Sequence, residues 1–155
     1  MAQVPDFMRV GTIISVPLGD SLFARGLVTH VSQKVKGCLT TFELCLYHDC
    51  DYDESFVCDF EKYSFYRIFH GLSGNEFDNN WRVVNTQAEI PESHSNMPYF
   101  FNQNTDEYCR TASDDPMVPL EYLKVIPEGA PVVPHGVATR KYIELKLRSL
   151  LAPKV

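Results

Sequence analysis

The stretch Val10-Gly-Thr-Ile-Ile-Ser-Val-Pro-Leu-Gly-Asp-Ser-Leu-Phe-Ala-Arg-Gly-Leu-Val-Thr-His-Val31 contains two runs of apolar and β-branched residues, one on each side of Gly19-Asp20. A glycine in the first position of such a pair supplies the positive φ angle that a tight hairpin turn prefers. The stretch therefore predicts a β-hairpin with strands over residues 10–18 and 22–31. Pro17 cannot donate a ladder hydrogen bond, so we expect it near a strand end or on an edge.

Further strands are predicted downstream of this hairpin. Residues 38–48 alternate between apolar and polar side chains, which indicates a third strand with one face in the core. The aromatic-rich run Tyr63–His70 and the short run Trp81–Val84 predict two more strands, with Trp81 buried in the core. The segment Pro91–Pro119 contains four prolines and shows no sustained period, so we expect a long irregular loop that buries its aromatic residues.

The C-terminal stretch Thr139–Leu151 is rich in strong helix formers. Its residues Ile143, Leu147 and Leu150 recur at helical spacing, and Thr139 is a candidate N-cap. The sequence therefore predicts a mostly β (α+β) protein with long loops and a C-terminal helix. Its strands are expected to form a small, strongly bent antiparallel sheet or an SH3-like barrel. A chain of 155 residues with 12% aromatic residues is expected to fold as a single domain over residues 1–155.

The charge of the chain is negative and unevenly distributed. The net charge is −6, and the segment Asp49–Glu61 carries six acids without any Lys or Arg. A surface of that sign repels phosphate and attracts basic proteins, so we expect a basic protein partner and no nucleic acid. The alternative interpretation is that the acidic segment is a solvated face that keeps the protein soluble.

The N-terminal residues carry no positively charged signal region, and no apolar run approaches the roughly 18 residues that span a bilayer. We therefore expect a cytoplasmic protein with no membrane partner. The five cysteines are an odd number in a chain of this size, which favours reduced thiols over a disulfide framework.

Candidate catalytic and metal-binding residues are scarce. The one metal-like cluster lacks the paired C-x₂₋₄-C spacing of a zinc site, so neither a metal nor another cofactor is predicted; its members are Cys38, Cys45, His48, Cys50 and Cys58. No G-x-S-x-G, P-loop, G-x-G-x-x-G or H-E-x-x-H motif occurs, and the pair Asp114-Asp115 is interpreted as solvated charge. No catalytic residue is predicted, and a small cytosolic enzyme of unknown reaction is the alternative to a binding protein.

The segment Val10–Val28 resembles the opening of the immunity protein 26 family of bacterial polymorphic toxin systems. That opening reads G-D-hydrophobic-hydrophobic-A-I-P-L, a short turn, and then an aromatic-A-x-G-hydrophobic-V strand. Thr12 stands where the family usually has Asp, and the turn lacks the common D-G pair. The resemblance implies a mostly β protein that binds and blocks a cognate toxin effector, which is encoded next to it. Many such toxins are basic nucleases, which an acidic inhibitor could occlude.

The residues that would contact the toxin are predicted from this chain itself, because the family supplies no positions to transfer. Two groups are candidates: the carboxylates of the acidic segment and the aromatic side chains of the proline-rich segment. They are Asp49, Asp51, Asp53, Glu54, Asp59, Glu61, Tyr99, Phe100 and Phe101.

Overall fold

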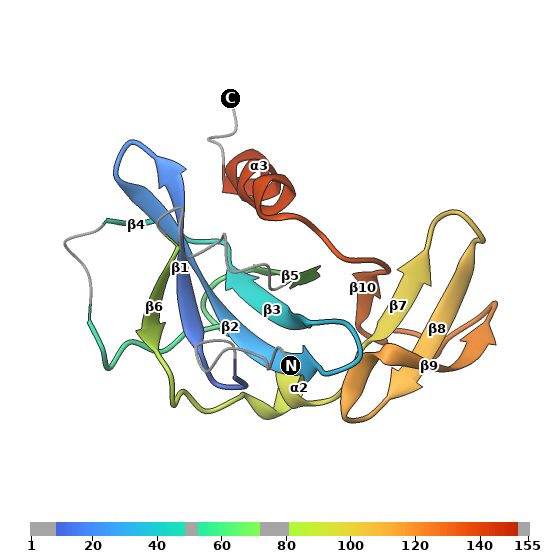
Figure 1. Ribbon diagram of the computed structural model, residues 1–155. Helices are drawn as coiled ribbons and strands as arrows, with labels where there is room; N and C mark the ends of the chain where they lie inside the picture. The colour runs from blue at the N-terminus through green and yellow to red at the C-terminus, as the bar shows by residue number, and fades with distance from the viewer. Residues whose placement is uncertain (1–8, 49–52, 72–80, 152–155) are drawn as a thin grey trace.

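The computed structural model describes residues 9–48, 53–71 and 81–151, which form two sheets and a C-terminal helix (Figure 1). The first sheet has the order β5-β3-β2-β1-β6, and β4 also pairs with β2. Its strands are β1 (Ile13–Gly19), β2 (Leu22–Ser32), β3 (Gly37–Glu43), β4 (Tyr47–His48), β5 (Phe65–Gly71) and β6 (Arg82–Asn85). The second sheet has the order β10-β7-β8-β9 and contains β7 (Tyr99–Asn102), β8 (Glu107–Ala112), β9 (Asp115–Leu123) and β10 (Val132–Pro134).

This architecture confirms the predicted mostly β class. The strands of the described residues form two bent sheets and do not close into a barrel, so the sheet alternative holds and the SH3-like barrel does not. The described ranges also contain two helices, α2 (Glu92–Ser95) and α3 (Arg140–Leu151). Neither of these helices is long and apolar enough to cross a membrane.

The predicted hairpin is confirmed as the centre of the first sheet. Strand β1 pairs with β2 in antiparallel register from Ile13 opposite Leu27 to Gly19 opposite Leu22. Gly19 has a φ of 94°, the positive angle for which a glycine was expected at the start of this turn.

Strand β3 differs from the prediction in length and in burial. It ends at Glu43, and residues 47–48 form β4, which pairs with β2 instead of continuing β3. All seven residues of β3 are buried, so the expected pattern of one buried face was wrong. The reason is that β3 lies between β2 and β5 and is covered on both faces by other parts of the chain.

Helix α3 covers one face of the first sheet, which we call the helix face and define by Ile14, Val16, Val28, Phe42 and Ile68. Those residues form one core cluster with Trp81, which is only 2% exposed and is confirmed as a core residue. From α3, Ile143 and Leu147 join the same cluster, whereas Leu150 is 39% exposed and lies outside it. The Oγ1 atom of Thr139 accepts a hydrogen bond from the N–H of Tyr142 (3.2 Å), which confirms Thr139 as the N-cap.

The opposite side of this sheet, the loop face, is less uniform. It carries one apolar cluster around Ile13, Leu27 and Val84 and another around Leu39 and Phe69. The second sheet contributes Phe100, Cys109 and Val133 to the latter cluster. The buried polar residues Arg25, Thr41, Glu43 and Arg67 lie on this face, since they alternate with the helix-face residues along β2, β3 and β5.

The segment predicted to be an irregular loop, Pro91–Pro119, contains instead α2, β7, β8 and most of β9. Its prolines do not interrupt a ladder, because Pro91 and Pro98 lie outside regular elements and Pro116 and Pro119 lie in the edge strand β9. The prediction was wrong because a proline excludes a strand only where that strand is paired on both sides. An edge strand such as β9 is paired on one side and tolerates the missing N–H.

Asp115 is buried rather than solvated, which corrects the interpretation of the Asp114-Asp115 pair. Its Oδ2 accepts hydrogen bonds from the N–H groups of Gln33 (3.1 Å) and Lys34 (3.3 Å), and its Oδ1 accepts one from Met117 (2.9 Å). Burial alone would raise the pKa of Asp115, but the hydrogen bonds that it accepts lower it. This carboxylate therefore ties β9 of the second sheet to the turn between β2 and β3.

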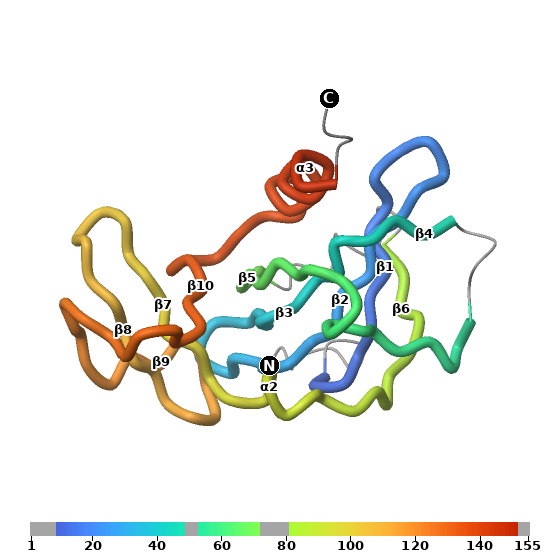
Figure 2. Tube along the Cα trace, turned by 180° about the vertical axis from the view of Figure 1, so that it is seen from behind, coloured from blue at the N-terminus to red at the C-terminus, as the bar shows by residue number. Residues whose placement is uncertain are grey.

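The linker between β10 and α3 connects the two sheets along their neighbouring edges (Figure 2). Strand β10 runs parallel to β7, and the N–H of His135 donates to the carbonyl of Phe101 (2.8 Å). Three residues later the N–H of Ala138 donates to the carbonyl of Phe69 in β5 (2.9 Å). The same extended segment thus passes from the edge of the second sheet to the edge of the first.

Candidate functional site

The described part of the acidic segment, residues 53–61, is packed against the loop face, and we call it the acidic loop. Its apolar side chains Phe56, Cys58 and Phe60 cover the cluster of Ile13, Leu27 and Val84. Its four acids are exposed: Asp53, Glu54, Asp59 and Glu61. The predicted site residues Asp49 and Asp51 lie outside the described residues.

A buried carboxylate holds the acidic loop in place. Glu43 of β3 is 0% exposed; its Oε2 accepts a hydrogen bond from the N–H of Asp59 (2.6 Å) and its Oε1 one from the hydroxyl of Tyr47 (2.7 Å). Burial raises the pKa of Glu43, and these two hydrogen bonds partly offset that rise because they favour the ionised form. Glu43 therefore fixes the second half of the loop to the sheet.

A buried cation anchors the first half of the same loop. The guanidinium carbon of Arg25 lies 4.4 Å from the ring centroids of both Tyr47 and Phe56, within the range of cation–π attraction. The amide nitrogen of Asn85 donates a hydrogen bond to the carbonyl of Phe56 (3.0 Å). Together with Glu43, these contacts attach the loop at several points to β2, β3 and β6.

Two of the exposed acids stabilise local turns, and two do not. Asp53 accepts hydrogen bonds from the N–H (2.9 Å) and hydroxyl (2.7 Å) of Ser55, whereas Asp59 accepts bonds from the N–H groups of Glu61 (3.1 Å) and Lys62 (3.0 Å). Among the described residues, the carboxylates of Glu54 and Glu61 have no hydrogen-bond or ion-pair partner. The loop therefore presents carboxylates to solvent from a backbone that is held in one conformation.

The predicted aromatic contact residues lie elsewhere. Tyr99, Phe100 and Phe101 belong to β7 in the second sheet, at the opposite end of the molecule from the acidic loop (Figures 1 and 2). Phe100 is 0% exposed and packs in the core, so it cannot form part of a contact surface, and its prediction is corrected. Tyr99 and Phe101 are half-buried. The structure thus does not bring the acidic and aromatic candidates together.

The metal-like residues are also separated. Cys38 lies in the core cluster of the helix face, whereas Cys58 packs on the loop face. Residues 9–48, 53–71 and 81–151 contain no group of three or more His, Cys, Asp or Glu side chains placed to hold a metal ion. Cys50 lies outside these ranges.

A cysteine–histidine pair that the sequence did not reveal lies beneath α3. The Nε2 atom of His70 lies 3.3 Å from the Sγ of Cys38 and 2.8 Å from the Oγ1 of Thr40. That spacing is typical of a nucleophile and its base, but His70 and Cys38 are both fully buried. Burial lowers the pKa of His70 to about 4, so the imidazole is neutral and the pair forms part of the core.

A strip of basic side chains lies between the two apolar clusters of the loop face. The Nε of Arg67 donates to Oγ1 of Thr41 (3.0 Å), and its buried Nη2 has no partner. Burial lowers the pKa of Arg67 to about 10 and also lowers that of His30, whose Nε2 donates to the carbonyl of Ser95 (3.0 Å). The pKa of His94 is lowered by burial and by the charge of Arg67. In all three groups the main cause is burial, which disfavours the charged form, and the charge of Arg67 adds to it at His30 and His94.

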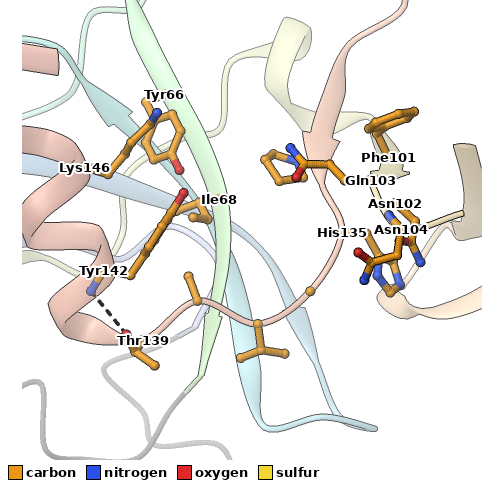
Figure 3. A pocket seen from close by; sticks show the side chains of 14 residues that line it. Tyr66, Ile68, Phe101, Asn102, Gln103, Asn104, His135, Thr139, Tyr142 and Lys146 are labelled. Atoms are coloured by element: carbon orange, nitrogen blue, oxygen red, sulfur yellow. Dashed lines mark hydrogen bonds between the residues drawn. The ribbon is translucent and has the colours of Figure 1, made fainter. Parts of the chain in front are cut away.

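A cleft of about 600 Å³ opens where the linker passes from one sheet to the other (Figure 3). Its walls come from β5, the end of β7, the linker and α3, with Tyr66, Tyr142 and Lys146 on one side and His135 on the other. The sequence does not indicate this site, because its residues are dispersed from position 66 to position 146 and share no motif.

No protein-family model matches this chain, and no curated protein or solved structure is significantly similar to it. The geometry offers two surfaces that a partner could recognise: an anchored loop with exposed carboxylates, and a cleft between the sheets.

Proposed function

We propose that this chain is an immunity protein, which binds a basic toxin effector through the acidic loop and neutralises it. The observation that supports the proposal is the anchoring of the loop, in which Glu43 and Arg25 hold the backbone while four carboxylates point to solvent. A solvated face that served only solubility would need no such anchors, because charge alone provides solubility.

Anchoring matters for binding because a loop that is already ordered loses little conformational entropy when a partner docks. The carboxylates then act in two ways on a basic surface. At a distance they steer the encounter and raise the association rate, and at contact they pair with Lys or Arg side chains.

A basic nuclease is the toxin class that fits this surface best. Its active-site groove must attract phosphates, so a fixed array of carboxylates can occupy the groove in their place. The partner in this proposal is the toxin effector encoded by the adjacent gene. The resemblance of Val10–Val28 to the immunity protein 26 family supports the same proposal.

The test is the association rate of a double variant, Glu54→Gln with Glu61→Gln. These two carboxylates have no hydrogen-bond or ion-pair partner among the described residues, so the substitutions remove charge without breaking a bond that holds the loop, unlike changes at Asp53 or Asp59. We expect stopped-flow binding to the adjacent gene product to slow several-fold at low salt. The difference should shrink at physiological salt, where screening acts over about 8 Å.

The matched control is the double variant Asp114→Asn with Glu128→Gln, which has the same change in net charge at exposed positions outside the acidic loop. Its association rate should stay close to that of the unmodified protein. Equal slowing of both variants would show that only net charge matters, and unchanged rates in both would assign binding to another surface. Either result would contradict the proposal.

A further inference from the structure

The cleft between the sheets has the size of a small-molecule site. Its volume of about 600 Å³ lies within the range of roughly 300–1,000 Å³ that is usual for ligand pockets. The hydrogen bonds of the linker to Phe101 and Phe69 hold its floor against both sheets. The cleft is therefore built into the fold, and it is separate from the acidic loop.

The charge of the cleft is opposite to that of the protein as a whole. The described residues that line it include no Asp or Glu, although the chain carries a net charge of −6. Lys146 of α3 contributes a positive charge, and its Nζ lies 6.0 Å from the ring centroid of Tyr66. A ligand with a negatively charged group is thus favoured over a neutral or cationic one.

Two tyrosines beside Lys146 supply aromatic surface. Tyr66 and Tyr142 interact through their side chains, and burial, followed by the proximity of Tyr142, raises the pKa of Tyr66. The Tyr66 ring therefore remains a neutral phenol. Tyr142 is 50% exposed at the opening of the cleft, where a planar ligand can stack on it.

The facing wall supplies hydrogen-bonding groups. Asn102, at the end of β7, and Gln103 and Asn104, in the turn after it, lie across the cleft from Tyr66 and Lys146 (Figure 3). The N–H of Asn104 binds Oδ1 of Asn102 (2.9 Å), whereas the side chains of Gln103 and Asn104 have no partner among the described residues. Free amides carry both donors and acceptors, which suits the edge of a heterocyclic ring.

From these three features we propose that the cleft binds a nucleotide-sized organic anion, in which a planar hydrogen-bonding ring is joined to a phosphate. The phosphate pairs with Lys146, the ring stacks on Tyr142, and the ring edge faces the amides of Gln103 and Asn104. This proposal does not depend on the proposed function, because it uses none of the residues of the acidic loop.

Calorimetric titration of the full chain with adenosine 5′-monophosphate tests the proposal, with adenosine and inorganic phosphate titrated in parallel. We expect binding at one site, with the nucleotide bound more tightly than either of its parts. The variant Lys146→Gln should weaken nucleotide binding by roughly tenfold, the loss expected for one charge-assisted hydrogen bond, while adenosine binding changes little.

Lys141→Gln is the matched control, because Lys141 is exposed on the same helix but does not line the cleft. It should leave nucleotide binding unchanged, and circular dichroism should show that both variants keep the fold. Equal weakening by the two lysine variants, or absence of nucleotide binding at millimolar concentration, would overturn the proposal. Phosphate bound as tightly as the nucleotide would overturn it as well, since the rings and amides would then contribute nothing.

Discussion

The two faces of the first sheet are both buried, but by different kinds of contact. The helix face packs Ile14, Phe42 and Trp81 against the apolar side of α3. The loop face interrupts its apolar clusters with Arg25, Glu43 and Arg67, all of them buried. One face is organised for burial of apolar area, and the other for holding a particular loop in a particular position.

The helix face thus mainly stabilises the fold, whereas the loop face also positions the acidic loop. Burial of apolar area stabilises a fold without regard to direction, whereas a buried charge costs free energy unless hydrogen bonds and partners compensate it. Glu43 and Arg25 are compensated by groups of the acidic loop and of β4, so their burial is coupled to the position of that loop. The hydrogen-bond partner of Arg67 is Thr41, which belongs to the sheet itself. The burial of Arg67 is therefore not coupled to the position of the acidic loop.

The largest effect is expected on the helix face. Trp81→Ala should reduce the free energy of unfolding by about 3–5 kcal/mol, because it leaves a cavity under α3 and removes the hydrogen bond from Nε1 to Glu144. Urea unfolding followed by circular dichroism measures this loss. Trp81→Phe is the milder control and should retain most of the stability. A loss below about 1 kcal/mol for the alanine variant would mean that the helix face tolerates a void and is not the stabilising one.

An intermediate effect is expected at Glu43 on the loop face. Glu43→Ala should cost about 2–4 kcal/mol, because it removes the acceptor of both the Tyr47 hydroxyl and the Asp59 N–H and leaves Arg25 with less compensation. Limited proteolysis should also become faster within residues 53–61, since the loop loses an anchor. Glu89→Ala, at an exposed position, is the control and should change neither quantity. Destabilisation without faster cleavage in the loop would contradict the view that Glu43 positions the acidic loop.

The smallest effect is expected at Arg67, although it is also buried. Arg67→Met should change the free energy of unfolding by no more than about 1 kcal/mol, and in the stabilising direction, because an apolar side chain of similar length avoids the desolvation of an unpaired cation. Thermal and urea unfolding measure the change. A loss above about 2 kcal/mol would indicate that the guanidinium makes an essential contribution to the packing of the loop face.

Sequence patterns predicted the elements whose signals are local. The hairpin over β1 and β2 follows from two apolar runs around Gly19, and α3 follows from helical spacing and the cap at Thr139. The burial of Trp81 follows from its size and from the β-branched residues after it. Each of these signals is contained within a few neighbouring residues.

Patterns failed where a distant segment decides the environment. The prolines of residues 91–119 indicated a loop, because the sequence does not reveal that β9 is an edge strand. The alternation along β3 predicted a half-exposed strand, since nothing local shows that loops and a second sheet cover its polar side. Asp115 and Phe100 were misjudged for the same reason, because the N–H groups of Gln33 and Lys34 and the side chain of Leu39 lie far away in the chain.

The sequence by itself determined the mostly β class, the central hairpin, the C-terminal helix and the acidity of residues 49–61, because these depend on local propensity and on composition. The tertiary structure alone decided how that acidity is displayed and where the cleft lies. The acidic loop is anchored by Glu43 and Arg25, and the cleft is formed by residues dispersed from position 66 to position 146. Contacts of this kind form only when the chain folds, since each partner is selected by packing and by satisfaction of buried polar groups rather than by its neighbours in sequence.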